Sequence, residues 1–167
     1  MTNRNYSRIS NFFKQEMTPE LDDISIAFRN GEYELFGRYV ISLNRAGYYT
    51  VTDNRDPEKV LEFSALKNAV AWCTLYDTAR YVDASRIKKL DMDIASAEVS
   101  IEIHRKLSND DKLNGEARWT QIVKFQEGIR KKKHHTAELQ RLINTSKRIQ
   151  LERFKSKNKQ KNFVRTR

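Results

Sequence analysis

Apolar residues recur at alternating spacings of three and four in the second half of the chain. In residues 81–104 these positions are Ile87, Leu90, Ile94, Ala97 and Ile101. Such spacing is the heptad signature of a helix that packs along one seam against another helix. A second stretch starts near Glu116 and carries Trp119, Ile122, Phe125, Ile129, Thr136, Leu139 and Ile143. Because the polar sequence SNDDKLNG separates the two stretches, we predict an antiparallel helical hairpin over residues 81–150.

The predicted seam has a polar gap. Folding back at SNDDKLNG would place Ile101 opposite Ile122 and Ile94 opposite Ile129, but the sequence RKKKHHTAE then follows without a large apolar residue. We favour cross-helix ion pairs here, between Asp91 or Asp93 and the lysines at positions 132 and 133. The alternative is a basic face that binds phosphate.

A β-hairpin is predicted upstream, over residues 48–63. YYTVTD alternates with period two, NRDPEK supplies a loop longer than two residues, and VLEF is a second short apolar run. Two strands alone are marginally stable, so the hairpin should lie on a helix. That helix should start at Ser64 as N-cap and end near residues 77–78, with a buried stripe of Leu66, Ala69, Val70, Cys73 and Tyr76 beside Trp72.

Two further segments are predicted to be helical. TPELDDISIAFRNG has Thr18 as N-cap, Pro19 in the first turn and Asn30-Gly31 as its end. YELFGRYVISLNRAGYY is ambiguous because residues 39–41 favour a strand. We favour a helix that ends at Ala46, with Gly47 as its C-terminal cap, and keep the strand as the alternative.

The composition agrees with a helix-rich chain, because the 167 residues include only five Gly and two Pro. The predicted fold class is α+β, predominantly helical: a short β-hairpin packed on helices, a long antiparallel helical hairpin and a basic C-terminal tail. The boundaries are a flexible N-terminal arm over 1–17, a small α+β domain over 18–78, the helical hairpin over 81–150 and a flexible tail over 151–167.

Positive charge is concentrated at one end of the chain. Residues 130–167 contain fourteen Lys and Arg against two acidic residues, whereas residues 1–129 contain eighteen against twenty. A neutral body with one basic end indicates a polyanion contact. Phe163 among these cations could stack on an unpaired base. The candidate binding residues are Arg130, Lys131, Lys132, Lys133, Lys147, Arg148, Arg153, Lys155, Lys157, Lys159, Lys161, Phe163, Arg165 and Arg167.

The search for catalytic chemistry yields no site. No glycine-rich phosphate loop is present, His134 and His135 diverge on a helix, and His104 should face Trp119. Cys73 is expected to be a small buried hydrophobe. Glu98 and Glu102 share a helix face, but Lys106 stands four residues after Glu102, which indicates a solvated ionic face. We predict no enzymatic activity, no metal site and no cofactor.

The chain also lacks membrane and disulfide signals. No apolar run reaches the roughly 20 residues that span a bilayer, and the polar start lacks the apolar core of a signal peptide. A single cysteine excludes an internal disulfide. We therefore expect a soluble protein made inside a cell, with no membrane partner.

Three segments carry a resemblance: LEFSALKNAVAWCTLYD, RIKKLDMDIASAEVSIEIHRKL and INTSKRIQLERF. In these the sequence resembles small uncharacterised proteins of tailed phages of marine bacteria, especially cyanophages, which share a short hairpin, an LKNAVAWC-type helix and a long helical pair. The likeness covers Tyr48 to Phe154 and includes no catalytic motif. It implies a phage protein located in the bacterial host cytoplasm or incorporated in the virion.

Two functions remain open at this point. The first is a non-catalytic phage protein that binds nucleic acid or another polyanion, such as an acidic protein surface, through its basic C-terminal segment. The alternative is a virion or assembly component, or an adaptor on a host complex, that uses the helical hairpin to bind a phage structural protein, a host protein or a second copy of itself.

Overall fold

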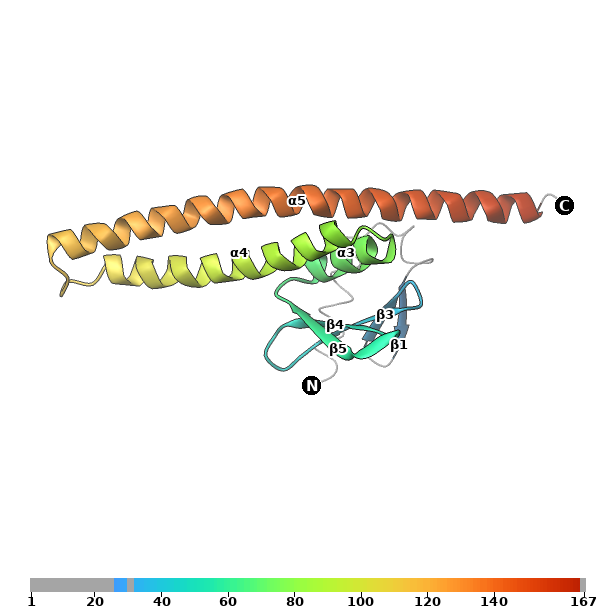
Figure 1. Ribbon diagram of the computed structural model, residues 1–167, viewed down its shortest axis with the longest axis horizontal. Helices are drawn as coiled ribbons and strands as arrows, with labels where there is room; N and C mark the ends of the chain where they lie inside the picture. The colour runs from blue at the N-terminus through green and yellow to red at the C-terminus, as the bar shows by residue number, and fades with distance from the viewer. Residues whose placement is uncertain (1–25, 30–31, 166–167) are drawn as a thin grey trace.

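The computed structural model describes residues 26–29 and 32–165, in which an antiparallel sheet is followed by three helices (Figure 1). The strands are β1 (Ile26–Arg29), β2 (Glu32–Leu35), β3 (Tyr39–Leu43), β4 (Tyr49–Asp53) and β5 (Asp56–Phe63). The helices are α3 (Leu66–Asp77), α4 (Tyr81–Ser108) and α5 (Gly115–Arg165). The predicted α+β, predominantly helical class is confirmed. The predicted N-terminal arm over 1–17 lies outside the described residues.

The sheet is larger than predicted. Its five strands form a meander in the order β1-β2-β3-β4-β5, and the predicted hairpin is its last pair, β4 and β5. The β4–β5 turn is shorter than predicted, because Asp53 and Asp56 are already paired across Asn54 and Arg55. A register shift follows between Thr52 and Asp53. The proline in β5 is tolerated because β5 is an edge strand. On an edge strand, proline can lack its N–H without breaking a hydrogen bond between neighbouring strands.

Both helices predicted before residue 48 are wrong where the structure describes them. Ile26–Arg29 forms β1 instead of helix, and residues 18–25 and 30–31 of that prediction lie outside the described residues. The favoured helix ending at Ala46 is replaced by β2 and β3, so the strand alternative was right. These strands meet at a tight turn in which Phe36 and Gly37 have φ values of 57° and 64°. Positive φ at both central positions matches the right-handed twist of a hairpin.

The core lies between the sheet and the helices. Tyr33, Leu35, Tyr39 and Ile41 are buried at every second position of β2 and β3, which is the period of a strand with one covered face. They pack on α3, which lies between the sheet and the two long helices (Figure 1). Being covered on both sides, α3 is buried along almost its whole length, including Trp72 and Cys73.

A buried carboxylate connects the start of α3 to α4. Asp91 is only 3% exposed, and it accepts hydrogen bonds from the Ser64 N–H at 3.0 Å, the Ser64 hydroxyl at 2.8 Å and Asn68 Nδ2 at 2.7 Å. The predicted N-cap role of Ser64 is therefore wrong, because Ala65 occupies that position. Asp91 is also not the partner of a lysine in α5, since these three donors already surround its oxygens.

The helical hairpin is confirmed, but part of its predicted seam is wrong. Ile87, Leu90, Leu139 and Ile143 are buried between α4 and α5. Trp119 and Ile129 are 64% and 44% exposed, so they do not face α4. Instead, Ile101 lies against Gly128, where an added Cβ would come within 2.9 Å of its Cγ1. The predicted pair of Ile94 with Ile129 is therefore wrong, and Ile101 contacts Gly128 of α5.

Helix α5 is longer than predicted. It continues without interruption to Arg165, where we predicted a flexible tail from residue 151. Figure 1 shows its C-terminal end running past α3 and α4 as a single helix. Lys, Arg and Gln are good helix formers, so a basic sequence does not by itself end a helix.

Candidate functional site

Most of the predicted polyanion-binding residues lie on the C-terminal part of α5. Lys147, Arg148, Lys155, Lys157 and Lys159 are exposed along this helix. The backbone of α5 also includes positions 161, 163 and 165, whose side chains lie outside the described part, as does Arg167 entirely. We refer to residues 151–165 as the distal segment of α5.

Cations surround the distal segment instead of forming one stripe. Lys155, Lys157 and Lys159 are two residues apart, and successive positions at this spacing differ by about 200° around a helix. Lys157 therefore projects from the opposite side of the helix to Lys155 and Lys159. Lys155 and Lys159 are also like charges four residues apart, a spacing that destabilises an isolated helix by about 0.2–0.5 kcal/mol. A polyanion would relieve this repulsion.

The run Arg130–Lys133 is divided among several sides of α5. Lys131 pairs with Glu127 at 3.2 Å on its own helix, and Lys132 pairs with Glu98 of α4 at 3.3 Å. Arg130 and Lys133 are exposed. A cross-helix ion pair is thus present as favoured, but the predicted acidic partners at 91 and 93 are wrong. These four cations do not form one continuous basic face.

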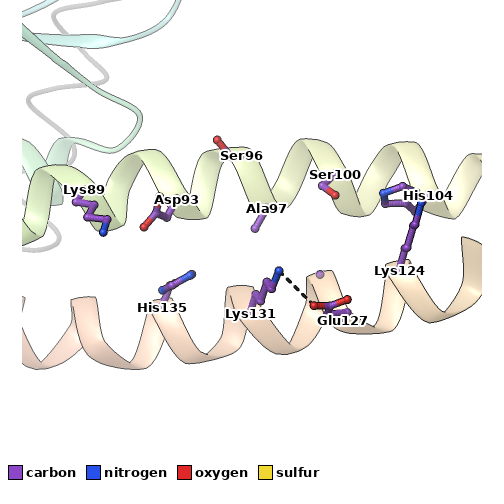
Figure 2. Close-up of a pocket in the computed structure, with 11 residues that line it drawn as sticks. Lys89, Asp93, Ser96, Ala97, Ser100, His104, Lys124, Glu127, Lys131 and His135 are labelled. Carbon is purple, nitrogen blue, oxygen red and sulfur yellow. Dashed lines mark ion pairs between the residues drawn. The ribbon is translucent and has the colours of Figure 1, made fainter.

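A polar groove separates α4 and α5 next to Lys131. Its volume is about 620 Å³, and Figure 2 shows side chains from both helices directed into the space between them. We call it the interhelical groove; its lining residues are Lys89, Asp93, Ser96, Ala97, Ser100, His104, Lys124, Glu127, Gly128, Lys131 and His135. The groove was not predicted from the sequence. It could have been inferred from the small residues, such as Ala97 of α4 and Gly128 of α5, that lie where a helical seam would otherwise carry large apolar side chains.

The histidines are arranged differently from the prediction. His104 Nδ1 lies 2.7 Å from Gln121 Oε1, so His104 does not pair with Trp119. The rings of His134 and His135 have centroids 5.8 Å apart, but only His135 lines the interhelical groove. Within the described residues, no group of three or more His, Cys, Asp or Glu side chains could hold a metal ion.

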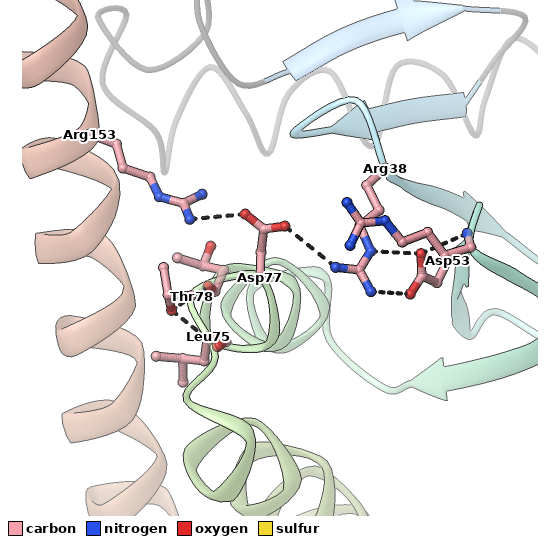
Figure 3. A network of polar contacts seen from close by, with 8 residues as sticks. Arg38, Asp53, Leu75, Asp77, Thr78 and Arg153 are labelled. Carbon is pink, nitrogen blue, oxygen red and sulfur yellow. Dashed lines mark hydrogen bonds and ion pairs between the residues drawn. The ribbon is translucent and has the colours of Figure 1, made fainter.

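Arg153 of the distal segment belongs to a structural network. Figure 3 shows Asp77, at the end of α3, between Arg153 and Arg38. The Asp77 carboxylate lies 2.9 Å from the Arg153 guanidinium and 3.9 Å from that of Arg38, and Arg38 forms a two-point pair with Asp53. The hydrogen bond from Arg38 lowers the pKa of Asp53. Arg153 also stacks over the Phe36 ring, with its guanidinium carbon 4.8 Å from the centroid. It joins α5 to α3 and the sheet.

The remaining reactive side chains have structural surroundings. Cys73 is fully buried, and this burial raises the pKa of its thiol well above the ordinary value, which disfavours the nucleophilic thiolate. Glu102 pairs with Lys106 as predicted, at 3.7 Å, and also with Arg105 at 2.7 Å. The Arg105 hydrogen bond lowers the pKa of Glu102, which favours an ionised surface carboxylate.

Comparison of the chain with protein-family models, curated proteins and solved structures gives no match. No described helix is both long enough and apolar enough to cross a membrane.

Proposed function

We propose that this chain binds nucleic acid through the distal segment of α5, without catalysing a reaction. The single observation that supports the proposal best is the extension of α5 past the body as a helix with exposed Lys155, Lys157 and Lys159. Because cations lie around this helix, it presents positive charge to phosphates on more than one side. Residues 147–167 contain nine basic residues and one acidic residue, so the charge is not neutralised within the segment.

The helical form of the segment favours double-stranded DNA over the single strands suggested by Phe163. An α-helix with side chains is about 10–12 Å across, and the major groove of B-DNA is about 12 Å wide. The fifteen positions of the distal segment would span about 22 Å along the groove. Cations on both sides of the helix could then contact both phosphate backbones. The deep, narrow major groove of A-form RNA would exclude the same helix.

A protein-binding role is the second candidate, and a separate observation favours it. On the outer faces of the helical hairpin, Val99, Ile103 and Trp119 are 61%, 50% and 64% exposed. Tryptophan is enriched among the residues that contribute most to binding at protein interfaces, and neighbouring exposed apolar side chains mark an interaction surface. We therefore keep a phage assembly component or host adaptor as the alternative, with the phage origin and host-cytoplasm or virion location as proposals. Co-purification from infected cells, with and without nuclease, separates the two candidates.

A salt titration of binding tests the nucleic-acid proposal. Binding of the full chain to a matched DNA duplex, single strand and RNA duplex should weaken linearly on a log-log scale as salt rises. Each phosphate contact contributes a slope of about −0.9 on duplex DNA. Changing Lys155, Lys157 and Lys159 together to Gln should flatten the slope on the DNA duplex by as much as about 2.7.

A matched control keeps the net charge equal. Lys59, Lys67 and Lys112 are also exposed but lie on β5, on α3 and in the α4–α5 turn. Changing these three lysines to Gln removes the same charge and should leave the slope almost unchanged. Equal flattening in both triple variants would show that only net charge matters, and it would reject the distal segment as the binding element.

A further inference from the structure

We propose that the interhelical groove binds the phosphate group of a small phosphate ester. The groove lies in the α4–α5 hairpin and shares no residue with the distal segment of α5. This second site is therefore independent of the proposed nucleic-acid function, and an experiment can reject one proposal without rejecting the other.

The groove results from an interruption of the apolar seam. Ala97 on α4 occupies a heptad position at which the buried end of the hairpin has Leu90, and Ser96 and Ser100 lie beside it. Small side chains leave a space of about 620 Å³. This volume falls within the roughly 300–1,000 Å³ range of small-molecule sites. A polar lining distinguishes the space from a packing defect, which would be apolar.

Nitrogen donors from both helices line this space. Figure 2 shows Lys89 of α4 and His135 of α5 toward one end of the groove, Lys131 beside Glu127 near its middle, and Lys124 near His104 at the other end. Within the described residues, neither Lys89 nor Lys124 has a carboxylate partner within 4 Å. His135 Nδ1 is buried and has no hydrogen-bond partner there. Lys89 is exposed and has no carboxylate that neutralises it, and the buried Nδ1 of His135 is costly without a hydrogen-bond partner.

These donors match a phosphate group. An ammonium group is a compact charge with three donors, which suits the oxygens of a phosphate. Two carboxylates share the groove, so the ligand should also carry hydroxyls that can donate to them. The charge of Glu127 is offset by Lys131 at 3.2 Å, which leaves Asp93 as the acceptor closest in sequence to Lys89. A hydroxylated phosphate ester satisfies both requirements, whereas a bare dianion satisfies only the first.

The three histidines provide an internal test by NMR. We would record the ring nitrogen signals of the full chain while inorganic phosphate replaces chloride at constant pH and ionic strength. His135 should shift with saturation, because it lies at the Lys89 end of the groove, whereas His104 at the other end should shift less. His134 is exposed outside the groove and should not shift. Equal, non-saturating shifts of all three histidines would overturn the proposal.

Two variants and a second probe complete the test. Lys89→Gln should weaken phosphate binding about five- to tenfold, as expected for one charge-assisted hydrogen bond. Lys133→Gln removes the same charge from the exposed side of α5 and should change the affinity less than twofold. Equal weakening by both would contradict a built site. The dinucleotide thymidylyl-thymidine carries a phosphodiester only. If it saturates the His135 shift and neither inorganic phosphate nor glycerol 3-phosphate does, the groove recognises a nucleotide phosphodiester, and the assignment to a small phosphate monoester is wrong.

Discussion

Two stretches of the same helix, residues 139–150 and the distal segment of α5, have opposite surroundings. In the first, Leu139, Ile143, Ser146 and Gln150 are buried at spacings of three and four. In the second, cations alternate with polar residues, and most described side chains are exposed. The first stretch packs on α3 and α4 through apolar side chains, whereas the second contacts the body through the cation Arg153. An uninterrupted helix can therefore combine a part that stabilises the fold with a part that is available for binding.

The largest effect should come from a truncation in the packed stretch. Leu139→Ala removes a side chain that is 4% exposed, so the free energy of unfolding should fall by about 2–5 kcal/mol. Leu151→Ala makes the same change at a position that is 39% exposed, and it should cost less than about 1 kcal/mol. Urea denaturation of both variants measures the difference. Equal losses would show that the two stretches do not differ in packing.

A buried hydrogen bond gives the next largest effect. Gln150 is 5% exposed, and its Nε2 donates to Thr74 Oγ1 of α3 at 2.7 Å. Gln150→Ala leaves the Thr74 hydroxyl without this donor and opens a cavity, so it should cost about 1–3 kcal/mol. Gln160 is exposed on the distal segment and serves as the control. Thermal unfolding should show a lower midpoint for Gln150→Ala alone; an unchanged midpoint would contradict the described packing of α5 on α3.

Acid pH should weaken the packed stretch in a defined direction. Arg86 of α4 forms a two-point pair with Glu138 of α5 at 2.6 and 2.7 Å, and this hydrogen bonding lowers the pKa of Glu138. A carboxyl group with a lowered folded-state pKa stabilises the fold above its unfolded value of about 4.3, and it loses this contribution as pH falls through the folded value.

The stability difference between the wild type and Glu138→Gln should therefore be present near pH 7 and vanish well below pH 4.3, roughly the unfolded value. Denaturation curves across this pH range measure it. Glu152→Gln changes an exposed acid and should show a smaller difference at every pH. A difference that grows toward acid pH would contradict the ion pair.

The smallest effect on stability should come from the distal segment. Changing Lys155, Lys157 and Lys159 to Gln removes like charges from an exposed helix, so the free energy of unfolding should change by less than about 0.5 kcal/mol. The same variant should lose much of its nucleic-acid binding. A large loss of stability, measured by urea denaturation, would show that these lysines hold the fold.

The pairing of the two long helices was easier to predict from the sequence than the secondary structure of the β2–β3 region. The α4–α5 hairpin followed from its heptad, and the exposure of the distal lysines followed from their charge. The β2–β3 pair did not, because Leu35, Tyr39 and Leu43 fit both helical and strand spacing. Burial of Tyr33 and Tyr39 on α3 decided between them, and that contact is tertiary.

The two candidate sites also differ in how far they could be predicted from the sequence. Charge along the chain is visible in the sequence, so the distal segment was predicted as a binding element although its helical form was not. The interhelical groove depends on which residues of α4 meet which residues of α5. The predicted register already brought Lys89 within one position of His135, but it placed His104 against Trp119 instead of Gln121, and it could not show that an open space lies between the helices.

Amide hydrogen exchange along α5, with and without a DNA duplex, tests the division of this helix most directly. Residues 139–150 should exchange slowly in both states, because opening them exposes the core. Residues 155–165 should exchange quickly in the free protein, because Lys155, Lys157 and Lys159 are exposed and repel one another, and they should become protected when the duplex is bound. Strong protection of 155–165 without DNA, or no added protection with it at saturating duplex, would contradict the account.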